Sequence, residues 1–144
     1  MTSLATIGYE KAVLADVIDR LQAAGVRIVL DVRAVASSRR AGFSKTLLAA
    51  SLNQAGIDYL HLRALGTPKA GRQAARAGRT DEMRRIFEAH LQEPEAQLAL
   101  AEAVEIARAR PAALLCYEAD ARDCHRAIVA ARIQAEIGCD IADL

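Results

Sequence analysis

Short apolar runs alternate along the chain with segments whose apolar residues recur at helical spacing. The runs at 4–8, 27–32, 57–62 and 112–117 are short and mostly apolar, as buried strands of a parallel sheet are. Between and after them, helical spacing or end signals predict helices over 12–24, 45–55, 80–90, 95–110 and 124–137. Residues 140–144 read either as a short fifth strand or as a frayed tail.

Polar residues and glycines mark the expected helix ends. Ser44 and Thr80 are predicted N-caps. Asp123, with Asp120 as the alternative, is predicted to cap a final helix that begins at Cys124. The segments 34–43 and 65–79 have neither the strand period nor the helix period, so both are predicted to be irregular.

The alternation of strands and helices predicts an α/β fold. We expect one domain over residues 1–144, with an open, mostly parallel sheet of four or five strands and helices on both faces. This is the three-layer arrangement of Rossmann-like and flavodoxin-like proteins. Ligands of such folds bind outside the carboxyl ends of the strands. The polar segments 9–10, 33–40, 65–72 and 118–126 all follow strands and should meet at that edge.

Composition narrows the class of protein. Only 3% of the residues are aromatic, so the core must be aliphatic. A net charge of +1 excludes a polyelectrolyte, and no apolar run approaches the roughly 18 residues of a membrane span. Three cysteines, with no signal-like segment before them, favour a cytoplasmic protein with reduced thiols.

Eight short motifs follow one another along nearly the whole chain. They are Thr6-Ile7-Gly8-Tyr9-Glu10, Asp31-Val32-Arg33, Ser38-Arg39, Gly42-Phe43-Ser44, Gly56-Ile57-Asp58-Tyr59, Leu65-Gly66-Thr67-Pro68-Lys69, Leu114-Leu115-Cys116-Tyr117-Glu118 and Cys124-His125-Arg126. In this order they resemble the motifs of the bacterial family called domain of unknown function 488. Two positions depart from its usual pattern: Ala36 replaces a common proline, and Tyr117 replaces a small residue. The resemblance implies an α/β fold and a cytoplasmic bacterial protein, and it implies no established activity.

Basic residues after several strands indicate an anion-binding pocket. Convergent guanidinium and ammonium groups near a helix start are the natural partners of phosphate or carboxylate. The alternative is that these side chains are ordinary surface charges or pair with Asp31, Glu118 and Asp123. The candidate ligand-binding residues are Tyr9, Asp31, Arg33, Ser38, Arg39, Lys69 and Arg126.

Glu118, Cys124 and His125 are the candidate catalytic residues. Glu118 directly follows a strand and suits a general acid or base, although a salt bridge is an equal alternative. A helix start and a neighbouring arginine would lower the pKa of the Cys124 thiol and make it a usable nucleophile or redox sensor; the alternative is a structural cysteine. Cys116 lies in an apolar run, where inert packing is expected.

A metal site is a competing interpretation. Cys116, Cys124 and His125, together with His61, offer thiolate and imidazole ligands, but the cysteine spacing is not a compact zinc pattern. We therefore expect no metal. We also expect no nucleotide cofactor, because no glycine-rich phosphate loop follows the first strand.

The predicted function is that of a small-molecule enzyme or ligand-binding protein with an anionic, phosphate-like or nucleotide-like ligand. One alternative is a nucleic-acid-binding module that uses the basic loops. Another is a cysteine-based redox or metal sensor. We expect no membrane partner, and the alanine-rich helix at 95–110 leaves pairing with a second copy open. The basic loops contain Arg39, Arg40, Lys69, Arg72, Arg76 and Arg79.

Overall fold

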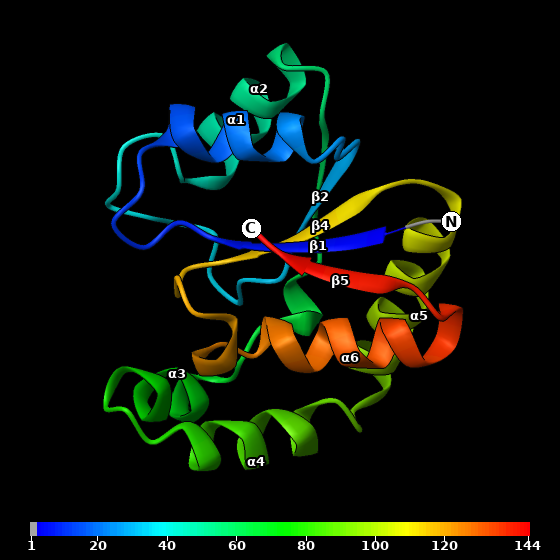
Figure 1. The fold of residues 1–144 in the computed structure, drawn as a ribbon. Helices are drawn as coiled ribbons and strands as arrows, with labels where there is room; N and C mark the ends of the chain where they lie inside the picture. Colours follow the sequence, from blue (N-terminus) through cyan, green and yellow to red (C-terminus); the bar gives the residue numbers. More distant parts are fainter. Residues whose placement is uncertain (1–2) are drawn as a thin grey trace.

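Five parallel strands form the central sheet of the computed structural model, which describes residues 3–144 (Figure 1). Their order across the sheet is β3-β2-β4-β1-β5, and every neighbouring pair is parallel. The predicted α/β class and parallel sheet are confirmed, and residues 140–143 form a strand rather than a frayed tail. The strands are β1 (Ser3–Gly8), β2 (Ile28–Asp31), β3 (Asp58–His61), β4 (Ala112–Cys116) and β5 (Asp140–Asp143).

Helices cover both faces of the sheet. Figure 1 shows α1 (Leu14–Ala23) and α2 (Lys45–Gln54) on one face, and α5 (Pro94–Ala109) and α6 (Arg126–Ile137) on the other. Each face has its own apolar core, as a sheet buried on both sides requires.

Side chains of β4 alternate between these two cores. Ala113 and Leu115 belong to the core beneath α1 and α2, whereas Leu114 and Cys116 belong to the core beneath α5 and α6. The alternation therefore points the Cys116 side chain to the same side of the sheet as α6.

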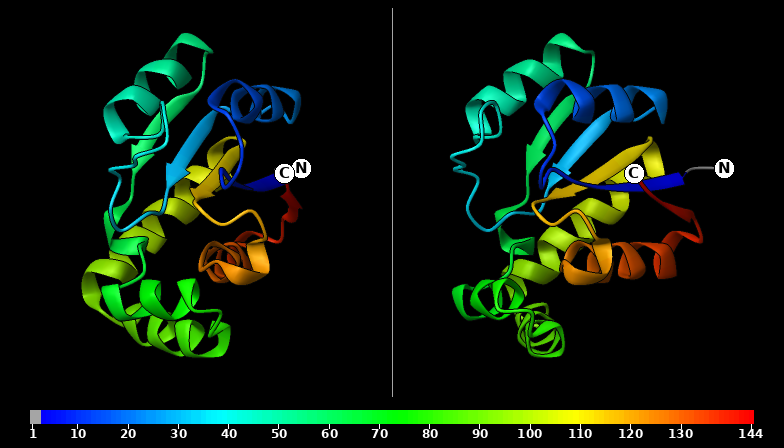
Figure 2. Two further views of the ribbon diagram at one scale, coloured as in Figure 1. Left: turned by 90° about the vertical axis from the view of Figure 1, so that its left-hand side faces the viewer. Right: turned by 60° about the vertical axis from the view of Figure 1, so that its left-hand side comes forward.

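Residues 69–76 are helical, so the prediction that the whole segment 65–79 is irregular was wrong. The segment contains the end of a 3-10 turn, η1 (Arg63–Leu65), and the helix α3 (Lys69–Arg76), which packs against α4 (Thr80–His90). Figures 1 and 2 show this helical pair beyond α6, on the side away from α1 and α2. The buried residues of α3 are Gly71 and Ala74, which are too small to give a visible apolar period in the sequence.

Two predicted caps were also wrong. Thr80 is the first residue of α4 rather than its cap, and α6 begins at Arg126 rather than at Cys124. Residues Ala121–Asp123 form a 3-10 turn, η2, and Asp120 caps it by accepting a hydrogen bond from the Arg122 N–H. The short aspartate side chain closes this turn locally, so the long helix starts later. Ser44 occupies the predicted N-cap of α2, but its side chain makes no capping hydrogen bond.

No helix within residues 3–144 is long and apolar enough to cross a membrane.

Candidate functional site

A cavity of about 950 Å³ lies at the carboxyl ends of β1, β2 and β4. Its walls come from each polar segment that follows β1, β2 and β4, and from α3 and the start of α4. The sheet thus brings segments that are far apart in the sequence to one rim, as parallel strands do. The polar and charged residues in the wall are Tyr9, Glu10, Arg33, Ser37, Thr67, Lys69, Arg72, Gln73, Arg76, Thr80, Tyr117, Glu118, Asp120, Asp123 and His125, with the thiols of Cys116 and Cys124.

Six of the ten predicted site residues line this cavity: Tyr9, Arg33, Lys69, Glu118, Cys124 and His125. The other four do not.

Asp31 is buried against Arg33, and Arg39 is exposed. The Ser38 hydroxyl accepts a hydrogen bond from the Arg40 N–H. Arg126 is buried and directs its guanidinium to backbone carbonyls.

Asp31 and Arg33 form the centre of a saturated polar cluster at the end of β2. The Asp31 carboxylate accepts from Arg33 Nε at 2.9 Å and from Nη2 at 2.7 Å, and Tyr59 donates its hydroxyl hydrogen to the same carboxylate at 2.5 Å. Arg33 Nη1 donates to the Tyr9 hydroxyl and to the Phe43 carbonyl. We call these five residues the Arg33 cluster.

Burial and ion pairing act in opposite directions on the Arg33 cluster. Burial alone would lower the pKa of Arg33, but the hydrogen bonds and charge of Asp31 outweigh it and raise that pKa. Burial, followed by the hydrogen bond to Asp31, raises the pKa of Tyr59 above its usual range. Arg33 is therefore a fixed cation whose charge is largely neutralised by Asp31.

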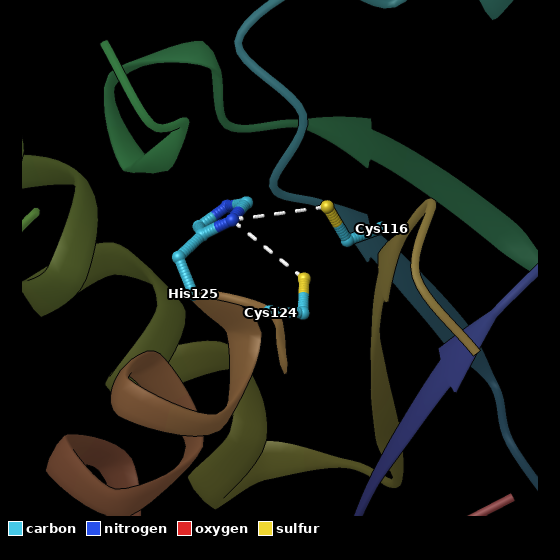
Figure 3. Close-up of side chains that lie close together, drawn as sticks. All are labelled: Cys116, Cys124 and His125. Atoms are coloured by element: carbon cyan, nitrogen blue, oxygen red, sulfur yellow. Dashed lines mark hydrogen bonds between the residues drawn. The ribbon is translucent and has the colours of Figure 1, made fainter. Parts of the chain in front are cut away.

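Cys116, Cys124 and His125 form a second polar group, which we call the sulfur–imidazole cluster (Figure 3). Cys116 is the last residue of β4, and the other two lie just before α6. His125 Nδ1 is 3.8 Å from Cys116 Sγ and 3.7 Å from Cys124 Sγ. All three residues are buried, yet all three line the cavity. The position of Cys116 in the sequence predicted inert packing in the apolar core, but this residue also lines the cavity.

The tautomer of His125 follows from its other ring nitrogen. Nε2 lies 2.7 Å from the Val32 carbonyl oxygen, which can only accept, so Nε2 carries a hydrogen. Nδ1 is then the atom that shares a proton with the thiols. The edge-to-face contact of the ring with Phe87, at 4.9 Å between centroids, holds this orientation.

The sulfur–imidazole cluster favours one thiolate. Burial alone would raise the pKa of Cys124, but the hydrogen bond from Cys116 and the charge of His125 lower it well below its ordinary value. Hydrogen bonding to Cys124 and burial raise the pKa of Cys116. Burial alone would lower the pKa of His125, but the charge of Cys124 outweighs burial and raises this pKa. Cys124 is therefore the stronger nucleophile or ligand of the two cysteines.

Glu118 lies beside the sulfur–imidazole cluster, with Oε2 3.7 Å from Cys116 Sγ. Burial, reinforced by the charge of Cys124, raises the pKa of its carboxyl to about 7. A carboxyl with this pKa can both give and take a proton at neutral pH. The alternative of a salt bridge is not found: Glu118 forms none within the described part of the chain.

The loop that carries Glu118 is fixed through its backbone. Arg126 donates to the Glu118 carbonyl at 2.5 Å and to the Ala119 carbonyl at 3.2 Å, and the Glu10 carboxylate accepts from the Ala119 N–H. A Cβ on Gly8 would lie 1.8 Å from the Glu118 carbonyl oxygen, so this close approach requires glycine. Arg126 was predicted to bind ligand, and here it positions the loop.

One wall of the cavity is a helix that the sequence pattern did not predict. Helix α3 presents Lys69, Arg72 and Arg76 to the cavity, and Arg72 also donates to the Thr67 carbonyl. The basic character of this segment was visible in the sequence, but its helical spacing of side chains was not recognised. His61, considered as a further metal ligand, instead places its Nε2 2.7 Å from the Arg33 carbonyl and lies outside the sulfur–imidazole cluster.

The fold and this rim define the class of protein: an open α/β domain with a polar cavity at the carboxyl edge of a parallel sheet. The sequence matches the family described as Domain of unknown function DUF488 over residues 13–133. This match covers most of the chain, so the protein belongs to that family, as the motifs predicted. Comparison with curated proteins and with solved structures finds no match.

Proposed function

We propose that the protein is a small-molecule enzyme or ligand-binding protein whose cavity takes an anionic ligand with a phosphate or similar group. The observation that carries this proposal is the cationic face of α3. Lys69, Arg72 and Arg76 all line the cavity, and none forms a salt bridge within residues 3–144. Cationic groups without a carboxylate partner, gathered around a cavity, attract an anion.

The distribution of charge around the cavity supports one orientation of the ligand. The unpaired cations lie on α3, whereas Glu118 and Asp123 lie in the loop between β4 and α6. An anionic group is stabilised next to α3 and gains nothing from these acidic side chains. The anionic end of the ligand therefore faces α3, and the rest extends toward the sulfur–imidazole cluster.

The reacting end of the ligand would meet Glu118, Cys124 and His125. Glu118 serves as the proton-transfer group, and Cys124 supplies a thiolate that His125 stabilises. A thiolate can act as a nucleophile or as a metal ligand, and the geometry that favours the second role is described below.

The remaining predicted residues would act around the ligand. Tyr9 and Arg33 line the cavity, and four of the five N–H groups of Arg33 are already used within the protein. Asp31 holds Arg33 in place and does not itself reach the ligand. Ser38 and Arg39 would act at the outer rim. The three free cysteines support a reducing, cytoplasmic setting.

Isothermal titration of pyrophosphate and of a nucleoside 5′-monophosphate tests the proposal. Lys69→Ala and Arg76→Ala should each weaken binding by about tenfold or more, since each removes a charged contact. Arg108→Ala is the matched control, because Arg108 is exposed on α5 and lies beside Glu105. The proposal is wrong if neither probe binds, or if all three variants bind alike. Tight, salt-dependent binding of an oligonucleotide in their place would support the nucleic-acid alternative.

A further inference from the structure

The hydrogen bonds within the sulfur–imidazole cluster, between His125 Nδ1 and the two sulfur atoms, are weak. Within residues 3–144, the hydrogen-bond partners of His125 Nδ1 are the sulfur atoms of Cys116 and Cys124, at 3.8 and 3.7 Å. Sulfur is a weak donor and a weak acceptor. A buried ring nitrogen and two buried thiols therefore face one another with only weak bonds between them.

We propose that Cys116, Cys124 and His125 bind a divalent metal ion of the zinc class through their two sulfur atoms and Nδ1. The three ligand atoms all lie within 4.8 Å of one another. Zn–S bonds of about 2.3 Å and Zn–N bonds of about 2.0–2.1 Å at tetrahedral angles put sulfur and nitrogen about 3.6 Å apart. The observed sulfur–nitrogen separations of 3.7 and 3.8 Å are close to this value.

The second ring nitrogen of His125 already makes the kind of hydrogen bond that the non-ligating nitrogen of a metal-binding histidine makes. Nε2 donates to the Val32 carbonyl at 2.7 Å, which fixes the ring and directs the Nδ1 lone pair toward the two sulfur atoms. Such an outer partner is a regular feature of zinc sites. The Arg33 cluster offers no comparable group of soft ligands, since its polar atoms are carboxylate, hydroxyl and guanidinium groups that bind one another.

The ligand types select the metal. Thiolate and imidazole prefer zinc and related ions over magnesium or calcium, which prefer oxygen. Two thiolates also balance the charge of a divalent ion, so the buried site is neutral when it is filled. Binding displaces the protons that the thiols and Nδ1 share, and these protons leave to solvent.

All three ligand residues line the cavity, so a metal held by them would have a fourth position that faces the space of the proposed ligand. Three protein ligands with an open position are typical of catalytic zinc sites, whereas structural sites are closed by four. The inference does not depend on the proposed anionic ligand, because the metal is held by these three residues alone.

The test measures metal rather than activity. The full chain is reduced, freed of metal with a chelator and titrated with Zn²⁺ and with Co²⁺, with bound metal determined by elemental analysis. We expect one equivalent of either metal, and for Co²⁺ the thiolate-to-metal absorption of a tetrahedral site. Cys116→Ser, Cys124→Ser and His125→Gln should each weaken Zn²⁺ binding more than about 100-fold, which exceeds the loss expected for an outer-shell partner.

Cys139→Ser is the matched control, because Cys139 is also buried and free but lies outside the cluster. It should bind metal as the wild type does. A second measurement avoids variants altogether: Zn²⁺ should protect Cys116 and Cys124 of the wild type, but not Cys139, from alkylation in mild denaturant. The inference is overturned if the reduced protein takes up no metal, if Co²⁺ binds without thiolate absorption, or if all three cysteines are protected equally. Each of these results leaves the test of the anionic ligand unaffected.

Discussion

The ends of β2 and β4, two adjacent strands, carry polar clusters that differ in how completely their groups are bonded. In the Arg33 cluster, a buried carboxylate meets a buried guanidinium at 2.7 Å, and tyrosine hydroxyls and a carbonyl complete the set. In the sulfur–imidazole cluster, the hydrogen-bond partners of His125 Nδ1 within residues 3–144 are two sulfur atoms. Both clusters lie beside the same cavity.

This difference indicates that the Arg33 cluster supports the fold, whereas the sulfur–imidazole cluster can take part in chemistry. A saturated, charge-balanced cluster gains little from a ligand, because most of its donors and acceptors are already used. A cluster with an available lone pair and an easily formed thiolate can bind or react. We therefore expect damage to the Arg33 cluster to reduce stability, and damage to the sulfur–imidazole cluster to change chemistry with a smaller effect on stability.

The largest effect is expected from Asp31→Ala. The substitution leaves the Arg33 guanidinium buried without its counter-charge, and breaking one side of a buried ion pair costs about 3–5 kcal/mol. Urea denaturation of the wild type and the variant measures the difference in the free energy of unfolding.

The double variant Asp31→Ala/Arg33→Met provides the control. Removing both charges should recover much of the lost stability, because no unpaired charge remains buried. A loss below about 1 kcal/mol in the single variant would mean that the Arg33 cluster is not saturated in the way described here.

Gly8→Ala is expected to have the next largest effect. The added Cβ would overlap the Glu118 carbonyl, so the loop between β4 and α6 must shift, and overpacking of this kind costs about 3 kcal/mol. Because this loop leads to Cys124, we also expect weaker Zn²⁺ binding. Thermal unfolding and the metal titration measure the two effects.

Gly25→Ala separates steric overlap from backbone strain. Gly25 has φ of 73°, but its added Cβ would meet nothing within 4 Å. It should therefore lose only about 1–2 kcal/mol from the left-handed conformation and keep its metal binding. Equal loss of metal binding in both variants would contradict the role given to Gly8.

Glu118→Gln should change how stability depends on pH. The folded-state pKa of about 7 lies above the ordinary value of 4.5, so between these values the folded protein holds a proton that the unfolded chain has lost. The protonated Glu118 carboxyl therefore contributes its full stabilisation below about pH 4.5, and this contribution is lost as the pH rises through 7. Glutamine does not titrate, so the variant should gain about 2–3 kcal/mol relative to the wild type between pH 5 and pH 8.

Urea denaturation of the metal-free proteins at the two pH values measures this difference. A relative stability that is the same at pH 5 and pH 8 would show that Glu118 is ordinarily acidic. Glu136→Gln is a control for the removal of a carboxylate, because Glu136 is exposed on α6.

The strands and most helices could be predicted from the sequence because apolar runs and helical periods are local. The helix α3 could not, since its buried face consists of Gly71 and Ala74 and has no large apolar residue. For Arg33, pairing with Asp31 was weighed as the alternative to ligand binding, and the ion pair is present. Binding and pairing give the same sequence pattern, so only geometry distinguishes them.

The sulfur–imidazole cluster was weighed from the sequence as a metal site, but the spacing of its cysteines did not favour one. Cys116 and His125 are brought together by the loop between them, and residues outside that loop set its course. Arg126 binds its carbonyls, and Gly8 of β1 allows it to approach the sheet. Sequence spacing alone contains neither contact, so the sequence names the three residues as possible ligands but does not show that they meet.

The smallest effect is expected from Asp58→Ala, which tests whether burial or distance accounts for the importance of the Arg33 cluster. Arg110 and Asp58 are also 2.7 Å apart, but their side chains are 40% and 62% exposed, against 5% and 0% for Arg33 and Asp31. Water solvates both charges when the exposed pair is broken, so the loss should stay below about 1 kcal/mol and shrink further in high salt. Urea denaturation at low and high salt measures it beside Asp31→Ala. Equal losses in the two variants would mean that the short contact itself, and not the absence of water, stabilises the end of β2, and the contrast between the two clusters would then need another physical basis.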